Sequence, residues 1–339
     1  MTSERIFRIG LVGAGNISRS HAGACKNLDR VELCAVSDVS VEALKAFGEQ
    51  FDVSRQYTEL DEMLEKEDLD IAVICTWGAL HRDVSNRIAR TQKVKAILCE
   101  KPFAQDAAEA EDMVMVAREN GILLAEAFKF RHHPIHLKAK ELVDEGALGE
   151  VNTIRNTFCM SGGDLANRTP DRNWRYNRSQ GGGSIYDLGC YCIHHARWIF
   201  DAEPVSVYTT VRMGHEVDDA IYTLLKFPGD RTAQISCGWG CGYAHYSEIG
   251  GSHGSLRLEP VWNNEGQALT LNYKGPDGPK DFEFEPIYQF VNQLDHLCDC
   301  LETGQPNRIP PENSINQMRV IDACFESMLT GEVVVMRES

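Results

Sequence analysis

The N-terminal part of the chain alternates short apolar runs with helical patterns, and this alternation constrains the fold more than any other feature. The apolar runs are typical of strands over Phe7–Val12, Val31–Ser37, Ile71–Cys75, Ala96–Cys99 and Ile122–Ala125. Helical patterns separate them, the first ending near Asn27 and the others covering Val41–Gln50, Glu59–Lys66, Leu80–Thr91 and Asp106–Asn120. Strands separated by helices of this length need crossover connections, which produce a parallel sheet with helices on its faces. We therefore expect an α/β domain with a parallel sheet here.

A glycine-rich turn, Gly13–Ser18, follows the first predicted strand and opens the first helix. Two glycines let the chain turn tightly and let a pyrophosphate approach the amides at the helix start, and Ser18 is small enough for the third glycine position. The pattern predicts a Rossmann dinucleotide-binding domain. Its expected cofactor contacts include Gly13, Gly15, Asn16 and Ile17.

Asp38 follows the second predicted strand, at about the distance expected for a carboxylate that binds the adenosine ribose hydroxyls. A carboxylate repels a 2′-phosphate, and no lysine or arginine lies between Val36 and Leu44 to attract one. We therefore expect NAD rather than NADP. Asp38 also fits a helix N-cap, and the two roles are compatible.

A carboxylate, an amine and a proline follow the strand Ala96–Cys99 directly, as Glu100, Lys101 and Pro102. In an open α/β sheet, ligands bind just beyond the carboxyl ends of the strands. The amine can reach a reacting oxygen there, and the carboxylate can accept from a sugar hydroxyl. The alternative is a surface ion pair followed by a helix-starting proline.

Thr76 and His81 follow another strand of the same sheet and are candidate cofactor contacts. His81 equally fits a structural role, capping or packing in the following helix.

The second part of the chain has a different pattern. The predicted strand Val151–Cys159 precedes a polar loop, Met160–Gln180, and the glycines Gly181–Gly183 then open a helix reaching Phe200. Successive strands without intervening helices extend from Val205 to Tyr273, which predicts a large, mostly antiparallel open sheet. Closing helices are expected over Tyr288–Glu302 and Ser314–Leu329.

Length and composition exclude several classes of protein. A chain of 339 residues is too long for one ordinary core, and 43% hydrophobic with 25% charged residues is typical of soluble globular proteins. A net charge of −16 argues against a surface for nucleic acid or anionic membranes. The sequence has neither a membrane-length apolar run nor a signal-peptide core, so we expect a cytoplasmic protein.

Twelve cysteines are scattered along the chain without a Cys-x-x-Cys pair, which fits reduced thiols in the cytoplasm. The run Cys190–His195 resembles a metal cluster. On a helix, however, only Cys190 and His194 share a face, so we expect packing rather than zinc and no metal.

Asp187 and Tyr191 are four residues apart on the helix after the glycines, and so would share one face. A carboxylate and a phenol one turn apart can hold two neighbouring oxygens of a polyol. A phenol near the Lys101 ammonium is also a usable proton donor or acceptor, which hydride transfer from an alcohol requires. The alternative is a buried hydrogen-bonded pair.

Three motifs in this order resemble the glucose–fructose oxidoreductase / inositol dehydrogenase / rhizopine-catabolism (Gfo/Idh/MocA) family, and the similarity covers nearly the whole chain. The motifs are Gly13–Gly15, Glu100–Pro102 and Gly181–Tyr191, with further similarity at Glu126–Phe128, Arg131, Pro134 and Gly146–Glu150. Tyr191 resembles the branch of glucose–fructose oxidoreductase, dimeric dihydrodiol dehydrogenase and xylose dehydrogenase, because inositol dehydrogenases carry histidine there. His194 departs from the aspartate or asparagine of many relatives.

The resemblance implies a Rossmann domain over residues 1–127 and a substrate-binding and oligomerisation domain over residues 128–339, with the closing helices as candidates for packing back onto the first. It implies that Lys101 is catalytic, that Glu100 lies near the nicotinamide ribose and that the Lys101–Pro102 bond is cis. It also implies a homodimer or homotetramer formed through the second sheet. The expected catalytic and substrate-binding residues are Lys101, Arg131, Trp174, Asp187, Tyr191 and His194.

The resulting hypothesis is an NAD-dependent oxidoreductase that transfers a hydride to or from a secondary alcohol or ketone of a sugar or sugar derivative, with Lys101 and Tyr191 at the reacting oxygen. One alternative is a glycoside-cleaving enzyme that uses NAD transiently, by oxidation, elimination and re-reduction. Another is a cofactor-binding regulator without turnover, which the presence of Lys101, Asp187 and Tyr191 disfavours. The expected partner is a small molecule such as a sugar, glycoside or polyol.

Overall fold

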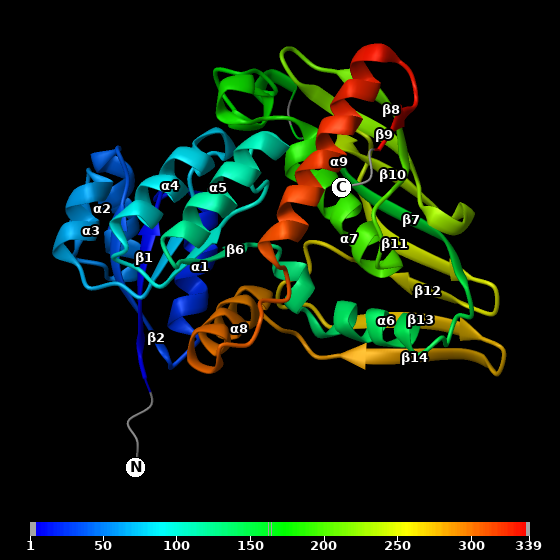
Figure 1. Cartoon of the computed structure of the whole chain (residues 1–339), viewed down its shortest axis with the longest axis horizontal. Coiled ribbons are helices and arrows are strands. Elements are labelled where there is room, and N and C mark those ends of the chain that lie inside the picture. The colour runs from blue at the N-terminus through cyan, green and yellow to red at the C-terminus, as the bar shows by residue number, and fades with distance from the viewer. Residues whose placement is uncertain (1–4, 162, 164, 337–339) are drawn as a thin grey trace. The chain divides into compact units, whose positions relative to one another are not determined.

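The computed structural model describes residues 5–161, 163 and 165–336, which divide into two compact units (Figure 1). Unit 1 contains Met1–Lys129 and Tyr288–Ile315, and unit 2 contains Phe130–Ile287 and Asn316–Ser339. The functional boundary at residues 127 and 128 stays a prediction.

Unit 1 is built on a six-stranded parallel sheet with the strand order β3-β2-β1-β4-β5-β6. The strands are β1 (Phe7–Val12), β2 (Val31–Ser37), β3 (Gln56–Tyr57), β4 (Ile71–Ile74), β5 (Ala96–Cys99) and β6 (Leu123–Glu126). The predicted Rossmann fold is therefore confirmed. The sequence pattern missed only the short edge strand β3.

Helices connect these strands, and one helix from the C-terminal part of the chain also belongs to unit 1. They are α1 (Asn16–Lys26), α2 (Val41–Phe51), α3 (Leu60–Lys66), α4 (His81–Thr91), α5 (Ala107–Glu119) and α8 (Gln289–Thr303). Side chains cap the N-termini of two of these helices. Ser40 accepts from the Ala43 amide at 3.2 Å before α2, and Asp106 accepts from the Glu109 amide at 2.8 Å before α5.

Helix α8 is part of the core of unit 1 although it lies far along the chain. Its Phe290, Leu294 and Leu297 belong to the same buried cluster as Phe7 and Leu11 of β1. The Tyr288 hydroxyl, just before α8, donates to the Ser20 carbonyl of α1 at 2.8 Å. Unit 1 is therefore assembled from two separate stretches of sequence.

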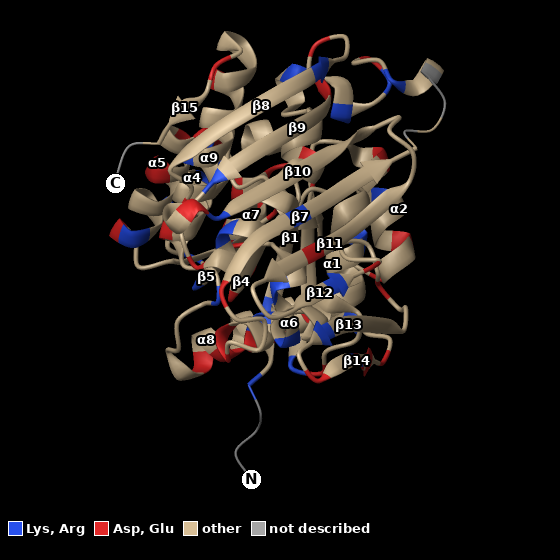
Figure 2. Cartoon of the chain, turned by 90° about the vertical axis from the view of Figure 1, so that its right-hand side faces the viewer, with Lys and Arg blue, Asp and Glu red and all other residues tan. Residues whose placement is uncertain are grey.

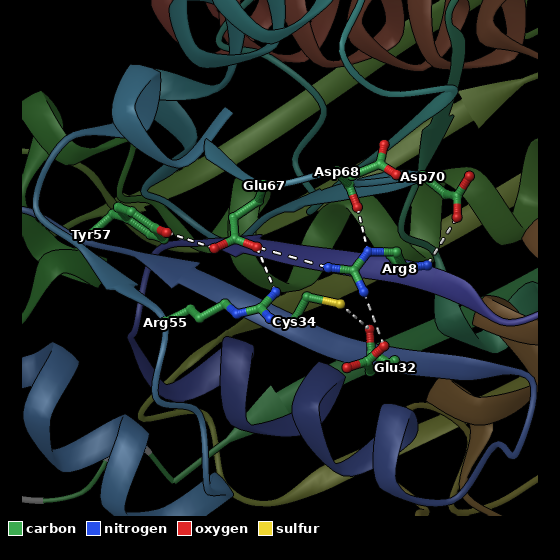
Figure 3. A network of polar contacts seen from close by, with 8 residues as sticks. All are labelled: Arg8, Glu32, Cys34, Arg55, Tyr57, Glu67, Asp68 and Asp70. Carbon is green, nitrogen blue, oxygen red and sulfur yellow. Dashed lines mark hydrogen bonds and ion pairs between the residues drawn. The ribbon is translucent and has the colours of Figure 1, made fainter. Parts of the chain in front are cut away.

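A network of polar and charged side chains connects the first strands of unit 1 to the segment that precedes β4 (Figure 3). The Arg8 guanidinium donates to the Asp68 carbonyl at 2.5 Å and to Glu32 at 3.2 Å. The mostly buried Glu67 carboxylate accepts from the Tyr57 hydroxyl at 2.6 Å, which raises the pKa of Tyr57 to about 12, and from Arg55 at 2.8 Å. These contacts hold β1, β2 and β3 to the segment before β4.

Unit 2 is built on a nine-stranded sheet with the order β14-β13-β12-β11-β7-β10-β9-β8-β15. Only β7 and β10 pair in parallel, which confirms the predicted, mostly antiparallel sheet. The strands are β7 (Val151–Met160), β8 (Ser206–Met213), β9 (Asp218–Lys226), β10 (Thr232–Trp239), β11 (Ala244–Gly251), β12 (Ser255–Leu258), β13 (Leu269–Gly275), β14 (Gly278–Phe284) and β15 (Val334–Val335). The edge strands β14 and β15 were not predicted.

Residues alternate across the strands of unit 2, so that one face of the sheet is buried and the other exposed. Helix α7 (Cys190–Phe200) packs on β7 and β10, and the other helices of this unit include α6 (Pro134–Asp144) and most of α9 (Pro311–Thr330). On the opposite face, Tyr208, Tyr222 and Leu224 are between 38% and 47% exposed. Figure 2 looks onto this sheet and shows few charged residues along β8, β9 and β10.

The predicted loop Met160–Gln180 contains three short 3-10 turns, at Leu165–Asn167, Trp174–Tyr176 and Arg178–Gln180; residues 162 and 164 lie outside the described part of the chain. Further 3-10 turns cover Gly78–Leu80, Lys129–His132 and Pro228–Asp230. Among the described residues, no helix has the length and apolar character needed to cross a membrane.

Candidate active site

The glycine-rich turn lies at the carboxyl end of β1 and borders a pocket of about 340 Å³. Gly13 has φ +105°, and a Cβ there would lie 2.8 Å from the Cys75 carbonyl oxygen, so the fold itself requires glycine. A Cβ at Gly15, in contrast, would meet no protein atom within 4 Å. The space in front of Gly15 and the exposed Asn16 is open, which fits the approach of a pyrophosphate to the start of α1.

Asp38 lies at the wall of this pocket, and backbone amides hold its carboxylate. One oxygen accepts from the Ala14 amide at 2.7 Å, and the other from the Ser40 amide at 2.8 Å. The side chain is therefore fixed beside the glycine turn while lining the pocket. The N-cap of α2 is Ser40, so the capping role predicted for Asp38 is wrong, because Asp38 lies two residues too early and accepts from the Ser40 amide instead. Its role at the cofactor stays a prediction.

The outer walls of the pocket include Trp77, Leu80 and Arg87. The Trp77 side chain is 49% exposed, which makes its ring available to a flat ligand. Arg87 donates from Nε to Asp61 at 2.5 Å. Arg87 lies on α4, far from Asp38 along the chain, and no local sequence pattern marks it as a residue of this pocket.

His81 connects two of the strand-end loops. Its Nδ1 lies 2.8 Å from the Pro102 carbonyl oxygen, and its Nε2 lies 3.2 Å from that of Thr76. Burial lowers the pKa of His81, against the opposing effect of these carbonyls. The ring is buried, so the structure places it behind the pocket wall that Thr76 helps to form. The peptide bond between Lys101 and Pro102 is cis, which confirms that prediction.

Two buried carboxylates lie at neighbouring strand ends of unit 1. Glu100 follows β5 and is 5% exposed, while Glu126 ends β6, pairs in register with Cys99 and is 2% exposed. Lys101 is half-buried beside Glu100. Glu126 belongs to the motif Glu126–Phe128, and its acidic side chain in an otherwise apolar strand is the sequence signal for a buried carboxylate at this edge.

In unit 2, Asp187 is held by an arginine that the sequence analysis did not single out. Arg175 donates from Nε to an Asp187 carboxylate oxygen at 2.7 Å and lies over the Trp174 ring at 4.8 Å. The Asp187 side chain is only 9% exposed. A Cβ at Gly182 would lie 2.6 Å from the Trp174 carbonyl oxygen. Glycine at this position therefore lets the backbone around Gly182 pack closely against that of Trp174 and Arg175.

The segment that carries Asp187 is not the uninterrupted α-helix that we expected. Ile185–Gly189 forms a π-helical turn, and the α-helix begins only at Cys190. Asp218 of β9 accepts from the Ser184 hydroxyl at 2.6 Å and from the Ile185 amide at 2.8 Å. Burial raises the pKa of Asp218 to about 6 in spite of these hydrogen bonds.

Tyr191 lies in an aromatic cluster of unit 2 and is 6% exposed. Its ring centroid is 5.7 Å from that of Phe158 and 5.9 Å from those of Phe130 and Trp262. Since these rings are buried, the orientation of the phenol is well determined by packing.

Arg131 and His194, both predicted at the substrate, contact each other. Arg131 Nη1 donates to His194 Nε2 at 2.8 Å, and the guanidinium lies 4.1 Å from the Trp198 ring centroid. Burial and the neighbouring Arg131 and Arg197 charges hold the pKa of His194 well below its usual value. A direct role of these two residues at a substrate stays a prediction.

The predicted site residues thus fall into two groups, with Glu100 and Lys101 in unit 1 and Asp187 and Tyr191 in unit 2. Their meeting at one reacting oxygen stays a prediction. None of the twelve cysteines, all of which lie in the described part of the chain, forms a disulfide. Within the part of the chain that the structure describes, no three His, Cys, Asp or Glu side chains are placed to hold a metal ion.

Two family models match the chain. Residues 7–128 match the model of the oxidoreductase family with an NAD-binding Rossmann fold, and residues 136–257 match the GFO/IDH/MocA C-terminal domain. The chain is 27% identical to trans-1,2-dihydrobenzene-1,2-diol dehydrogenase of Mus musculus, covering 88% of this chain and 89% of that protein. It is also 27% identical to D-xylose 1-dehydrogenase (NADP(+)) 2 of Haloferax volcanii, covering 96% and 98%.

The structure is similar to that of aldose-aldose oxidoreductase from Caulobacter crescentus complexed with glycerol. The TM-score is 0.88 and the sequence identity 29%, over 98% of this chain and 100% of the other.

Proposed function

Because the chain belongs to the GFO/IDH/MocA family of NAD(P)-binding oxidoreductases, we propose that it transfers a hydride between NAD and a secondary alcohol or ketone of a sugar or sugar derivative. The observation that carries the proposal is the open space in front of Gly15, beside the fixed carboxylate of Asp38. A dinucleotide fits there, with its pyrophosphate at the start of α1 and its adenosine ribose at Asp38. The relatives act on dihydrodiols and aldoses by name, which supports a polyhydroxylated substrate.

The protein's own residues would transfer the proton and orient the substrate. Bound NAD supplies a hydride acceptor, and the alcohol must lose its hydroxyl proton as the hydride leaves. We assign that proton to the Tyr191 phenol, and to Lys101 the stabilisation of the phenolate and the polarisation of the reacting oxygen. Asp187, held by Arg175, would orient an adjacent hydroxyl of the substrate.

The function is tested by a substrate screen with pyranoses, glycosides, inositols and dihydrodiols in the presence of NAD. We expect net reduction of NAD with at least one of them, measured as absorbance of the reduced nicotinamide. Release of an aglycone without net reduction would support the glycoside-cleaving alternative. Tight NAD binding without either signal would support a regulator.

Cofactor choice is a separate prediction. Replacing Asp38 with serine and Val39 with arginine should shift preference from NAD toward NADP, because the carboxylate is removed and a cation is added at an exposed position of the same pocket. The measurement is kcat/KM with each cofactor, with Val39→Ser alone as the control. A wild type that uses NADP at least as well as NAD would contradict the assignment.

We also propose that the exposed face of the second sheet forms a homo-oligomer. Tyr208 pairs directly with Leu224, and Tyr222 continues this apolar strip. Tyr222→Glu combined with Leu224→Lys should lower the mass measured by light scattering, while Met115→Glu, at an equally exposed apolar residue of α5, should not. A wild-type monomer at micromolar concentration would contradict this proposal.

A further inference from the structure

A buried histidine of α1 contacts the carboxylate that precedes the predicted catalytic lysine. His21 is 1% exposed, and its Nε2 lies 2.7 Å from Glu100 Oε1. The other Glu100 oxygen accepts from the Lys101 amide at 3.2 Å. Each oxygen of the carboxylate therefore has a donor, one from α1 and one from its own loop.

The geometry also assigns the hydrogen on the His21 ring. A carboxylate oxygen accepts hydrogen bonds, so Nε2 must be the donor. His21 Nδ1 is buried without a hydrogen-bond partner among the described residues. The ring meets Phe290 of α8 edge to face, with centroids 5.3 Å apart. Apart from its bond to Glu100, His21 behaves as an apolar residue of the core.

The position of this pair explains why a polar ring would be retained there. Helix α1 starts at the turn proposed to bind the pyrophosphate, and Glu100 begins the loop that carries Lys101. Both belong to unit 1. A hydrogen bond between them fixes the Lys101 loop relative to the helix that would bind the cofactor.

We propose that His21 is a positioning residue that orients the Glu100 carboxylate, and through it the Lys101 loop, toward the bound cofactor. This inference rests on the function proposed above. It differs from simple core packing because packing needs only the shape of the ring, whereas positioning needs its N–H group.

The surroundings of Glu100 make the loss of this donor costly. Titratable groups near Glu100 include Cys75 at the end of β4, Cys99 of β5 and His81 of α4. The buried Lys129 ammonium lies 5.0 Å from the Phe290 ring that His21 also contacts. Burial raises the pKa of both thiols and lowers the pKa of His81. Without the His21 donor, one oxygen of this buried carboxylate would lose its hydrogen bond, which lowers stability.

The first test uses His21→Phe, which keeps the ring and its contact with Phe290 but removes the donor. We expect kcat to fall by about 10- to 100-fold, the scale typical of residues that orient a functional group, with a smaller change in the KM for the sugar. His21→Gln, which can donate again, should recover part of the loss.

The second test needs no activity and so separates this inference from the proposed function. Chemical unfolding of the cofactor-free protein is measured for His21→Phe, Glu100→Gln and the double variant. If the two residues are coupled, Glu100→Gln destabilises the wild type but restores stability in the His21→Phe background, because it removes an unpaired buried charge. The control is His296→Phe in α8, a buried histidine of the same unit that accepts from the Arg308 amide.

Additive losses of stability, together with a kcat of His21→Phe close to that of the wild type, would overturn the proposal. If the wild type binds no NAD, the proposed function fails, while the unfolding cycle still decides whether His21 and Glu100 are coupled.

Discussion

Replacing Tyr191 with phenylalanine is expected to lower turnover by about a hundred- to ten-thousand-fold, because the variant has no proton to exchange with the reacting oxygen. This corresponds to about 3 to 5 kcal/mol in the activation free energy. The Phe158, Phe130 and Trp262 rings around Tyr191 would pack equally well on phenylalanine, so the fold should be retained. NAD affinity should hardly change, since the phenol is proposed to lie far from the adenosine.

Turnover against pH for wild type and Tyr191→Phe is the decisive measurement. Tyr186→Phe is a matched control, because Tyr186 is a buried tyrosine of the same segment that packs on Phe325. Lys101→Ala should reduce turnover at least as much as Tyr191→Phe, because it removes both a charge and a hydrogen bond. Near-normal turnover of Tyr191→Phe would show that another group takes the proton.

Acidification is expected to destabilise unit 2 strongly through its buried histidines. Burial lowers the pKa of His195 to about 3. It also lowers the pKa of His136 and of His194 well below the usual value of a histidine. The positive charge of Arg131 lowers the pKa of all three further. Below about pH 6.5 the unfolded chain protonates these histidines while the folded chain keeps them neutral. The unfolded state then binds more protons, so the free energy of unfolding falls as pH falls.

The size of this effect follows from the linkage relation. Below its unfolded pKa, each histidine lowers the free energy of unfolding by about 1.4 kcal/mol for each pH unit of acidification. The three together should therefore lower the free energy of unfolding by roughly 4 kcal/mol between pH 7.5 and 5.5. Asp218 opposes the loss below about pH 6, because its raised pKa means that the folded state takes up a proton first. The loss remains large against a typical stability of about 5 to 15 kcal/mol.

Denaturant unfolding at several pH values measures this prediction. His195→Phe should reduce the slope of the free energy of unfolding against pH by about 1.4 kcal/mol per pH unit, the value for one proton. Replacing the exposed His215 with alanine should leave this slope unchanged. A free energy of unfolding that stays constant from pH 7.5 to 5.5 would contradict it.

Local patterns were sufficient for the regular parts of the fold. The strands Val31–Ser37 and Ala96–Cys99 have the predicted bounds, because each is a continuous apolar run between clear turn signals. Strand β14 was missed because its residues are largely exposed at the edge of the sheet, with proline and charged residues in place of an apolar pattern. No local sequence pattern marks the π-helical turn at Ile185–Gly189, and the carboxylate that accepts from its first amide, Asp218, lies on a different strand.

The candidate site was predictable where one motif carries its own chemistry, as at Gly13, Gly15 and Asp38. Contacts between distant parts of the chain were not predictable in this way. The ion pair between Arg175 and Asp187 and the hydrogen bond between His21 and Glu100 leave no periodicity in the sequence. Such partners become visible only when the fold brings their elements together.

The return of α8 to unit 1 has a consequence for how the protein is made. A nascent chain that has reached residue 129 contains all six strands of the sheet but lacks Phe290, Leu294 and Leu297, which complete its core beside α1. The apolar surface that these residues cover must stay exposed while unit 2 is synthesised. Unit 1 is therefore the first unit to be synthesised, but its core is completed only near the end of translation. This makes unit 1 the part most in need of protection from aggregation on the ribosome.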